Sequence, residues 1–324
     1  MKLPRRTFLH LTAGAAALSA MPRVASALDY PTRPVHIVIP YPAGGAPDII
    51  GRLIGQWLSE RLGQQFIVDN RPGAASNIGT EIVAKAQPDG YTLLIAVSTN
   101  AVNATLYTKL NFNFVNDLGP VAGVGRTPFV MVVNPLLFPA KTIPDFIAYA
   151  KVHPGEINTV SQGIGTTPYV CGELLKMMTG IDLIQVPYRG DIMPDLLGGR
   201  VQVAFPPIAQ AIAYVRDGRL RALGVTTATR SDALPDVPAI GEFVPGYEAS
   251  GWYGICAPTG TPTEIIDKLS KEIAAGVADP ALNARLLTLG VEPRALTTAE
   301  FGKFIANEIE KWAKVIKFAN IKVD

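Results

Sequence analysis

The residues best suited to bind a small molecule lie in a glycine-rich turn within residues 37–58, IVIPYPAGGAPDIIGRLIGQWL. Gly44 and Gly45 follow an apolar run and give the backbone a freedom that does not continue a strand. Pro47 suits the first turn of a helix. The segment therefore predicts unpaired backbone N–H groups at a helix N-terminus, an arrangement that binds anions.

No recognisable catalytic set accompanies this turn. The sequence has no G-x-S-x-G motif, no P-loop lysine, and no H-E-x-x-H or C-x-x-C spacing. His36 lies in a predicted strand and His153 precedes a Pro-Gly turn, so we expect both to be structural or exposed. Glu308 and Glu310 are expected on a solvated helix face. The pattern predicts capture of a small anion without catalysis, metal or cofactor.

A second glycine turn of the same design lies at residues 161–168, SQGIGTTP, about 120 residues after the first. Its Thr166 and Thr167 can cap the following helix or donate hydrogen bonds to a ligand. Between the two turns, Ser98 and Asn100 follow a predicted strand and can either cap the next helix or line a pocket. Two such turns predict two α/β units that face each other, with the ligand between them.

The elements that must position these turns alternate between strands and helices. This order is typical of parallel strands covered by helices on both faces, where ligands bind beyond the C-terminal ends of the strands. Strands are predicted at residues 37–39, 65–68, 91–97, 129–133, 157–160, 183–186, 201–205, 220–225 and 252–257. Besides those that follow the two glycine turns, helices are predicted at residues 77–86, 142–151, 263–277, 280–289 and 298–318.

The chain is expected to cross between the two units twice. We predict that residues 28–129 and 253–324 form one α/β domain and residues 130–252 the other, each a mostly parallel sheet flanked by helices. Trp252 is expected to be a core or hinge residue rather than a ligand platform. The two cysteines, Cys171 and Cys256, are expected to be unpaired core residues, with a disulfide as the alternative.

The first 27 residues have the features of an export signal. Arg5 and Arg6 form a twin-arginine pair, residues 11–21 are short and alanine-rich, and residues 25–27 form an A-x-A cleavage site. The alternative is an ordinary secretory signal, which also leads out of the cytoplasm. Without the four basic residues of this leader the net charge falls from +2 to −2, which gives no support for nucleic-acid binding. No later stretch is apolar enough to insert into a membrane.

Six motifs in sequence resemble one known family, the Bug (TctC-like) extracytoplasmic solute receptors of tripartite tricarboxylate transporters. The resemblance covers about residues 30–320, nearly the whole mature chain. The motifs are Gly44-Gly45 with Asp48, PDGYTLL at 88–94, Gly165-Thr166 with Gly172-Glu173, VPYRG at 186–190, DLLGG at 195–199 and APTGTP at 257–262.

The resemblance implies a type II-like periplasmic-binding-protein clamshell that closes on a small carboxylate. It also implies that backbone groups and waters from two facing loops, residues 41–48 and 163–169, hold the ligand. Asp48 is expected either to shape its loop or to contact the ligand, and Tyr188 and Arg189 are expected to lie at the rim. The candidate ligand-binding residues are Tyr41, Ala43, Gly44, Gly45, Asp48, Ser98, Asn100, Gly165, Thr166, Thr167, Tyr169, Tyr188 and Asp191.

Some positions depart from the family pattern. Tyr169 stands where His is common, Cys171 where Ala is common, and Gln202 where Asp is common. The segment 191–194 looks about two residues shorter than usual, and its Asp191 adds a carboxylate near the expected pocket rim. These changes affect the choice of ligand rather than the fold.

The function predicted from these residues is a periplasmic receptor that captures a small carboxylate and presents it to the membrane permease of a tripartite tricarboxylate-type transporter. The chain is expected to act as a monomer, with no cofactor, nucleic acid or direct membrane insertion. One alternative is an exported binding component that signals to a membrane kinase. Another is an exported α/β enzyme, for which Tyr169 and Asp191 would be the first residues to test.

Overall fold

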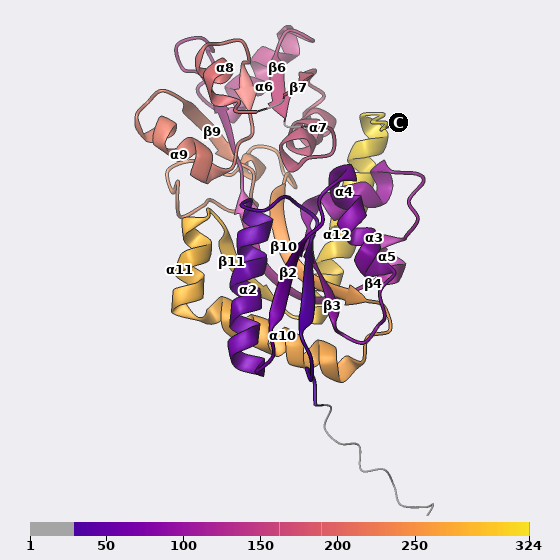
Figure 1. Ribbon diagram of the computed structural model, residues 1–324. Coiled ribbons are helices and arrows are strands. Elements are labelled where there is room, and N and C mark those ends of the chain that lie inside the picture. The colour runs from indigo at the N-terminus through magenta and orange to yellow at the C-terminus, as the bar shows by residue number, and fades with distance from the viewer. Residues whose placement is uncertain (1–28, 162, 189, 324) are drawn as a thin grey trace, which may run out of the picture.

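The computed structural model describes residues 29–161, 163–188 and 190–323. Figure 1 shows two lobes, each built on its own sheet. Lobe 1 holds a six-stranded sheet in the order β11-β4-β10-β3-β1-β2, and lobe 2 holds a five-stranded sheet in the order β7-β6-β8-β5-β9. The predicted two-lobed α/β architecture is therefore confirmed.

The sheet of lobe 1 combines both ends of the chain. Its strands are β1 (Val35–Ile39), β2 (Phe66–Asn70), β3 (Thr92–Val97), β4 (Leu118–Pro128), β10 (Ser250–Pro258) and β11 (Glu292–Leu296). β1 pairs in parallel with β2 and β3, whereas β10 pairs antiparallel with β3 and β4. The helices of this lobe are α2 (Ala46–Leu62), α3 (Asn77–Ala84), α4 (Ser98–Leu106), α5 (Phe114–Asp117), α10 (Thr263–Ala278), α11 (Pro280–Thr288) and α12 (Thr298–Phe318).

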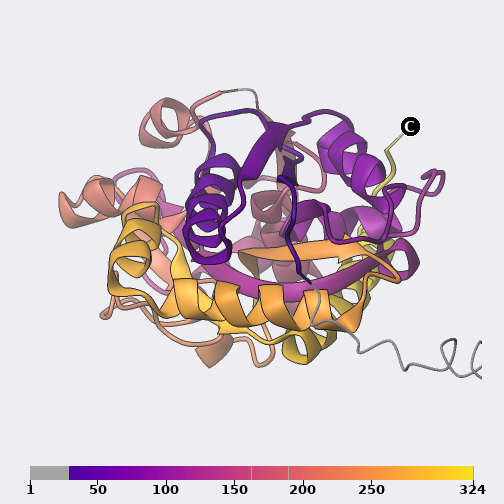
Figure 2. The same cartoon turned by 60° about the horizontal axis from the view of Figure 1, so that its bottom comes forward.

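Strand alternation sends the apolar side chains of this sheet to two separate cores. Ile37 of β1 and Ile95 of β3 belong to the cluster that packs against α2 and α10. Their neighbours Val38 and Leu94 point to the other face and join the cluster that includes residues of α3, α4 and α12. Figure 2 shows α10 running across the strands on the first of these faces. Both faces are covered by helices, which explains why β1 and β3 are apolar along nearly their whole length.

Lobe 2 is formed from a single continuous stretch of chain. Its strands are β5 (Val130–Val133), β6 (Asn158–Ser161), β7 (Ile184–Pro187), β8 (Val203–Ala204) and β9 (Arg221–Val225). Its helices are α6 (Ile143–Val152), α7 (Thr167–Thr179), α8 (Met193–Leu197) and α9 (Ile208–Arg216). β6 is parallel to β7 and β8, but β5 is antiparallel to β8 and β9.

The expectation of mostly parallel sheets needs correction, because both sheets are mixed. The strands that carry the chain between lobes cause this: β4 and β10 form one antiparallel pair in lobe 1, and β5 runs antiparallel to both its neighbours in lobe 2. Parallel pairing is retained where a helix connects neighbouring strands, as between β1 and β2.

Two adjacent crossings connect the lobes. The chain enters lobe 2 at Phe129 and returns through residues 226–249, before β10 begins. Thr226 is fully buried and joins the crossings: its N–H donates to the Phe129 carbonyl at 2.9 Å, and its own carbonyl accepts from the Ala249 N–H at 2.8 Å. The predicted boundary between residues 252 and 253 falls inside β10, all of which belongs to the sheet of lobe 1.

Cys171 and Cys256 are buried free thiols, so their interpretation as unpaired core residues is confirmed. Burial raises the pKa of each thiol to about 12. Across the described part of the chain, no helix combines the length and the apolar character needed to cross a membrane.

Candidate functional site

Asp48 holds the first glycine turn in shape. Its carboxylate accepts the Gly44 N–H at 2.9 Å and the Asn70 side-chain amide at 2.9 Å, and it pairs with Arg52 at 3.0 Å. Burial raises the pKa of Asp48, but the hydrogen bonds from Arg52, Gly44 and Asn70 outweigh it and hold the pKa below its ordinary value. The ionised carboxylate is only 3% exposed, so it holds the turn in shape from the interior side of the loop.

The backbone at the tip of this turn is open to approach. Ala43, Gly44 and Gly45 are exposed, and Gly44 adopts a left-handed conformation with φ +87°. A Cβ atom built on Gly44 would meet no atom within 4 Å, and one on Gly45 would come no closer than 3.7 Å to Pro47. Gly45 is the N-cap of α2 and provides no side-chain acceptor. The N-terminal end of α2, with the backbone N–H groups of its first turn, therefore lies next to open space.

Tyr41 connects this turn to the start of α4. Its hydroxyl lies 2.9 Å from the Thr99 hydroxyl, and its carbonyl accepts from the Asn70 amide at 3.1 Å. Burial raises the pKa of Tyr41, although the hydrogen bond with Thr99 acts in the opposite direction. The phenol is therefore protonated at neutral pH and available as a donor.

Ser98 and Asn100 open α4 but differ in what their side chains contact. Asn100 is directed into lobe 1: its Oδ1 accepts the Val97 N–H at 2.8 Å and its Nδ2 donates to the Thr80 hydroxyl at 2.8 Å. Ser98 instead reaches lobe 2, where its Oγ lies 2.9 Å from Oγ1 of Thr167. Of the two roles that the sequence allowed, Asn100 takes the helix-capping one in this structure.

The Ser98–Thr167 contact brings the start of α7 against α4. A Cβ atom on Gly165 would come within 2.7 Å of Leu106 and 3.6 Å of Val102, both residues of α4. Gly165 also adopts φ +81°, so this position favours glycine for its backbone conformation as well as for space. The two predicted glycine loops therefore meet across the lobes by way of α4.

The remaining residues of the second loop have local contacts. Thr166 is the N-cap of α7, but its hydroxyl donates back to the Gly163 carbonyl at 2.8 Å instead of capping the helix. The Tyr169 carbonyl accepts from Gln185 at 3.1 Å. Burial raises the pKa of the Tyr169 phenol, and the nearby Glu173 carboxylate raises it further.

Tyr188 and Asp191 lie in lobe 2. The Tyr188 N–H donates to the Ser161 carbonyl at 2.9 Å, and its ring packs against the apolar cluster of lobe 2. The exposed Asp191 accepts the Met193 N–H at 3.1 Å, at the start of α8. No hydrogen bond or ion pair found among the described residues joins either side chain to the first loop. Arg189, the other predicted rim residue, lies outside the described residues.

Taken together, three helices begin at this site. In α2, α4 and α7 the side chain of the N-cap residue makes no hydrogen bond to the first turn, although at α4 the Asn100 side chain accepts the N–H of the N-cap Val97. The Tyr41–Thr99 and Ser98–Thr167 contacts bring their first turns together. Helix N-termini carry partial positive charge and free N–H donors, so this arrangement suits a carboxylate or another small anion.

A family model, TctC, described as the tripartite tricarboxylate transporter family receptor, matches residues 50–321. The chain belongs to this family. As a TctC-family protein it is a solute-binding receptor, as the sequence predicted.

Relatives of this TctC-family chain match it over almost their whole length. Protein BugT of Bordetella pertussis is 35% identical over 303 residues, which is 92% of this chain and 93% of BugT. The Rhodopseudomonas palustris protein Rpa4515, solved with adipate, is 36% identical with a TM-score of 0.75 and covers 90% of this chain and 99% of its own. MatC of the same organism, solved with bound malate, is 28% identical with a TM-score of 0.71. The match covers 89% of this chain and 100% of the MatC chain.

Two residues near the site of this TctC-family chain were missed from the sequence. Thr99 bonds Tyr41, although only its neighbours Ser98 and Asn100 were singled out. The Tyr253 hydroxyl of β10 accepts from the Thr127 hydroxyl at 3.3 Å; burial raises the pKa of Tyr253, the bond from Thr127 lowers it, and the nearby Tyr41 raises it. Thr99 lies between the two residues that were singled out, but Tyr253 is brought near Tyr41 only by sheet pairing.

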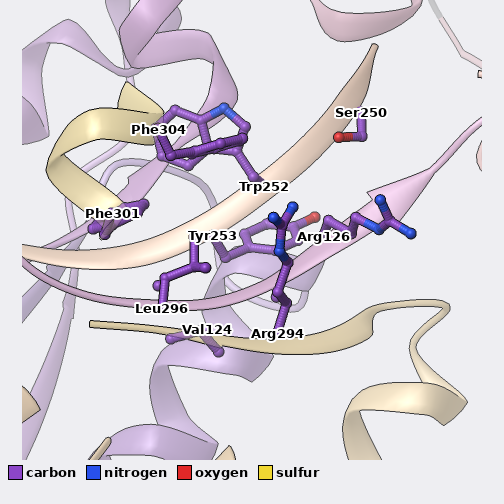
Figure 3. Close-up of a pocket in the computed structure, with 11 residues that line it drawn as sticks. Val124, Arg126, Ser250, Trp252, Tyr253, Arg294, Leu296, Phe301 and Phe304 are labelled. Atoms are coloured by element: carbon purple, nitrogen blue, oxygen red, sulfur yellow. The ribbon is translucent and has the colours of Figure 1, made fainter. Parts of the chain in front are cut away.

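One small cavity lies away from these loops. The cavity in Figure 3 lies among β4, β10, β11 and α12, is lined by residues such as Trp252 and Arg294, and has a volume of about 10 Å³. That is about the room of one water molecule, so it cannot hold a carboxylic acid. Within the described ranges, no three His, Cys, Asp or Glu side chains gather as a metal site.

Proposed function

We propose that this receptor captures a small carboxylate between its lobes and delivers it to the membrane permease of a tripartite tricarboxylate transporter. The observation that carries the proposal is the convergence of the N-termini of α2, α4 and α7 through the Tyr41–Thr99 and Ser98–Thr167 contacts. The adipate and malate bound to two solved relatives support the ligand class.

The proposed site needs no cationic side chain to reach a useful affinity. A hydrogen bond to a charged group contributes about 1.5–3 kcal/mol. A helix N-terminus adds about 0.3–1 kcal/mol. Three or four such bonds, less the cost of ordering the ligand and the lobes, give about −8 kcal/mol, which corresponds to a micromolar Kd.

Hydroxyl groups would complete the binding of the carboxylate. Ser98 and Thr167 hydrogen-bond to each other across the lobes, and either hydroxyl can turn to donate to a carboxylate oxygen that lies beside them. The Tyr41 phenol, whose pKa is raised by burial, stays protonated and keeps its proton for donation. The exposed backbone at Gly45 would contribute an N–H group from the opposite side, whereas the Gly44 N–H is already held by Asp48.

The proposal also covers the export of the chain, its location and the fate of the ligand. The leader would export the chain by the twin-arginine route, so that the mature receptor acts in the periplasm as a monomer. The ligand would be released unchanged, since the proposed site relies on N–H and O–H donors rather than on a nucleophile and its base. The domain division proposed from the sequence, residues 28–129 with 253–324 and residues 130–252, is moved at its second boundary to the start of β10 at Ser250.

A thermal-shift panel tests the proposed function. The purified mature chain is heated with adipate, malate, monocarboxylates, aromatic acids and matched amides. A bound acid should raise the midpoint according to RT ln(1 + [L]/Kd), and its amide should not. Chromatography of the recovered acid tests for turnover. The proposal fails if no small acid shifts the midpoint, or if the acid that does so is consumed.

A further inference from the structure

Glu308 of α12 is a buried carboxylate that accepts from two indoles. Its Oε2 accepts the Nε1–H of Trp252 at 3.1 Å and the Nε1–H of Trp312 at 3.0 Å, and its Oε1 pairs with the Lys311 ammonium. It is 6% exposed, so the sequence-based expectation of a solvated face was wrong for Glu308. Glu310, in contrast, is exposed and pairs with Lys314 at 2.7 Å. Helical spacing places both acids on α12 but does not show which one faces Trp252.

This carboxylate lies where the second crossing rejoins lobe 1. Trp252 is the third residue of β10, and Figure 3 shows it leaving that strand toward Phe304 of α12. Its ring packs edge-on against Phe304 and Phe301, with 5.7 Å between ring centroids in each case. Lys311 also donates to the Glu248 carbonyl at 3.1 Å, just before β10. The Glu308–Lys311 pair thus fixes the end of the crossing to α12.

The same crossing is fixed to lobe 2 on its other side. Tyr247, which is fully buried, donates from its hydroxyl to the Cys171 carbonyl in α7 at 3.1 Å. Side chains of α7 and α12, including Leu174 and Val315, belong to one continuous apolar cluster. The path therefore runs from Glu308 through the crossing to α7, the helix that brings Thr167 to Ser98.

We infer that Glu308 and Lys311 are positioning residues: by fixing the crossing between α12 and α7 they set the orientation of the lobes, and with it the fit of the ligand site. The inference rests on the proposed function for its effect on ligand affinity. Indole N–H groups buried in a core need an acceptor, and a carboxylate with a fixed cation provides one that is directional as well as charged. An apolar residue at position 308 would leave both indoles without a partner.

The test compares this pair with the exposed pair on the same helix. Glu308→Gln and Lys311→Met remove the charge of one partner with little change in size, and Glu310→Gln and Lys314→Met are the matched controls. Spin labels on Glu60→Cys of α2 and Lys151→Cys of α6, both exposed positions, report the distance between lobes. The native thiols are buried and can stay. Adipate is the ligand probe, and circular dichroism checks folding.

The inference predicts that both test variants broaden or displace the ligand-free distance distribution and raise the adipate Kd by about fivefold or more. The two controls should match the parent chain. A merely stabilising role would lower the melting temperature but leave the distances and Kd of the folded protein unchanged, which would overturn the inference. If Glu308→Gln does not fold, the inter-lobe distances and the adipate Kd of Lys311→Met decide whether the inference holds. If the parent chain binds no acid, the proposed function fails, whereas the ligand-free distances still test Glu308.

Discussion

The hydroxyl of Ser98 lies 2.9 Å from the hydroxyl of Thr167, and this contact joins the first turn of α4 in lobe 1 to the first turn of α7 in lobe 2. Both side chains are buried, although each belongs to a different lobe. Two neutral hydroxyls bind each other weakly compared with a carboxylate. A carboxylate oxygen that lies beside both hydroxyls would therefore replace one weak hydrogen bond with two charge-assisted ones.

Thr167→Val should weaken carboxylate binding about tenfold, because it removes one charge-assisted donor and keeps the shape of the side chain. Titration calorimetry with the tightest acid of the panel measures the change. Thr179→Val is the matched control: this threonine ends the same helix and bonds only the Leu175 carbonyl. Equal affinities in the two variants would remove Thr167 from the site.

Gly45→Val should abolish binding while leaving the fold intact. Gly45 has φ −78° and a Cβ there meets no atom closer than 3.7 Å, so the free protein accommodates the side chain, but an approaching carboxylate does not. Gly119→Val is the control, since a Cβ there meets only the Ala257 carbonyl at 3.9 Å in lobe 1. Binding and melting temperature are measured together, and unchanged affinity for Gly45→Val would exclude the first turn.

Asp48→Asn should lower the free energy of unfolding by about 1–3 kcal/mol, since the Gly44 N–H, the Asn70 amide and the Arg52 guanidinium lose the buried charged acceptor that they share. The pKa of Asp48 is lowered by folding, so its contribution is complete above the unfolded-state pKa of about 4 and is lost as the pH falls through the folded-state value. Urea unfolding at pH 7 and below pH 4 measures both effects. The variant should lose less stability on acidification than the parent; an equal loss would contradict the assignment.

Cys171 and Cys256 should not react with a thiol reagent such as DTNB at pH 8 in the folded protein. Burial raises each pKa to about 12, and the thiolate is the reacting form. Both should react in urea, which gives the total count of thiols. Prompt labelling of the native chain would show that lobe motion exposes one of them.

The sequence predicted the two glycine turns better than it predicted the side-chain contacts around them. The turns before α2 and α7 were found because glycine, proline and a helical apolar spacing act locally. Which side chains meet was not visible: Ser98 reaches Thr167 while Asn100 turns inward, although both begin the same helix. That difference depends on where α7 lies, which is a matter of tertiary packing.

β4 and β11 were missed for a related reason. β4 reads LGPVAGVGRTP, and its glycines and prolines argue against a strand. In the structure, a Cβ on Gly123 would come within 2.9 Å of Leu296, and one on Gly125 within 2.8 Å of the Glu292 carbonyl, so β11 could not pack there otherwise. Glycine usually indicates irregular backbone, but in β4 it provides room for the next strand.

The position of β10 between β3 and β4 also affects the order in which the chain can fold during synthesis. Every strand of lobe 2 has left the ribosome once Val225 has emerged, so its sheet can form early. Lobe 1 is synthesised first, but β3 and β4 do not pair with each other. Each pairs with β10, so the sheet of lobe 1 stays incomplete until Ser250–Pro258 has been synthesised. Long-range pairings of this kind form slowly. The lobe that starts the chain is therefore the last to be completed.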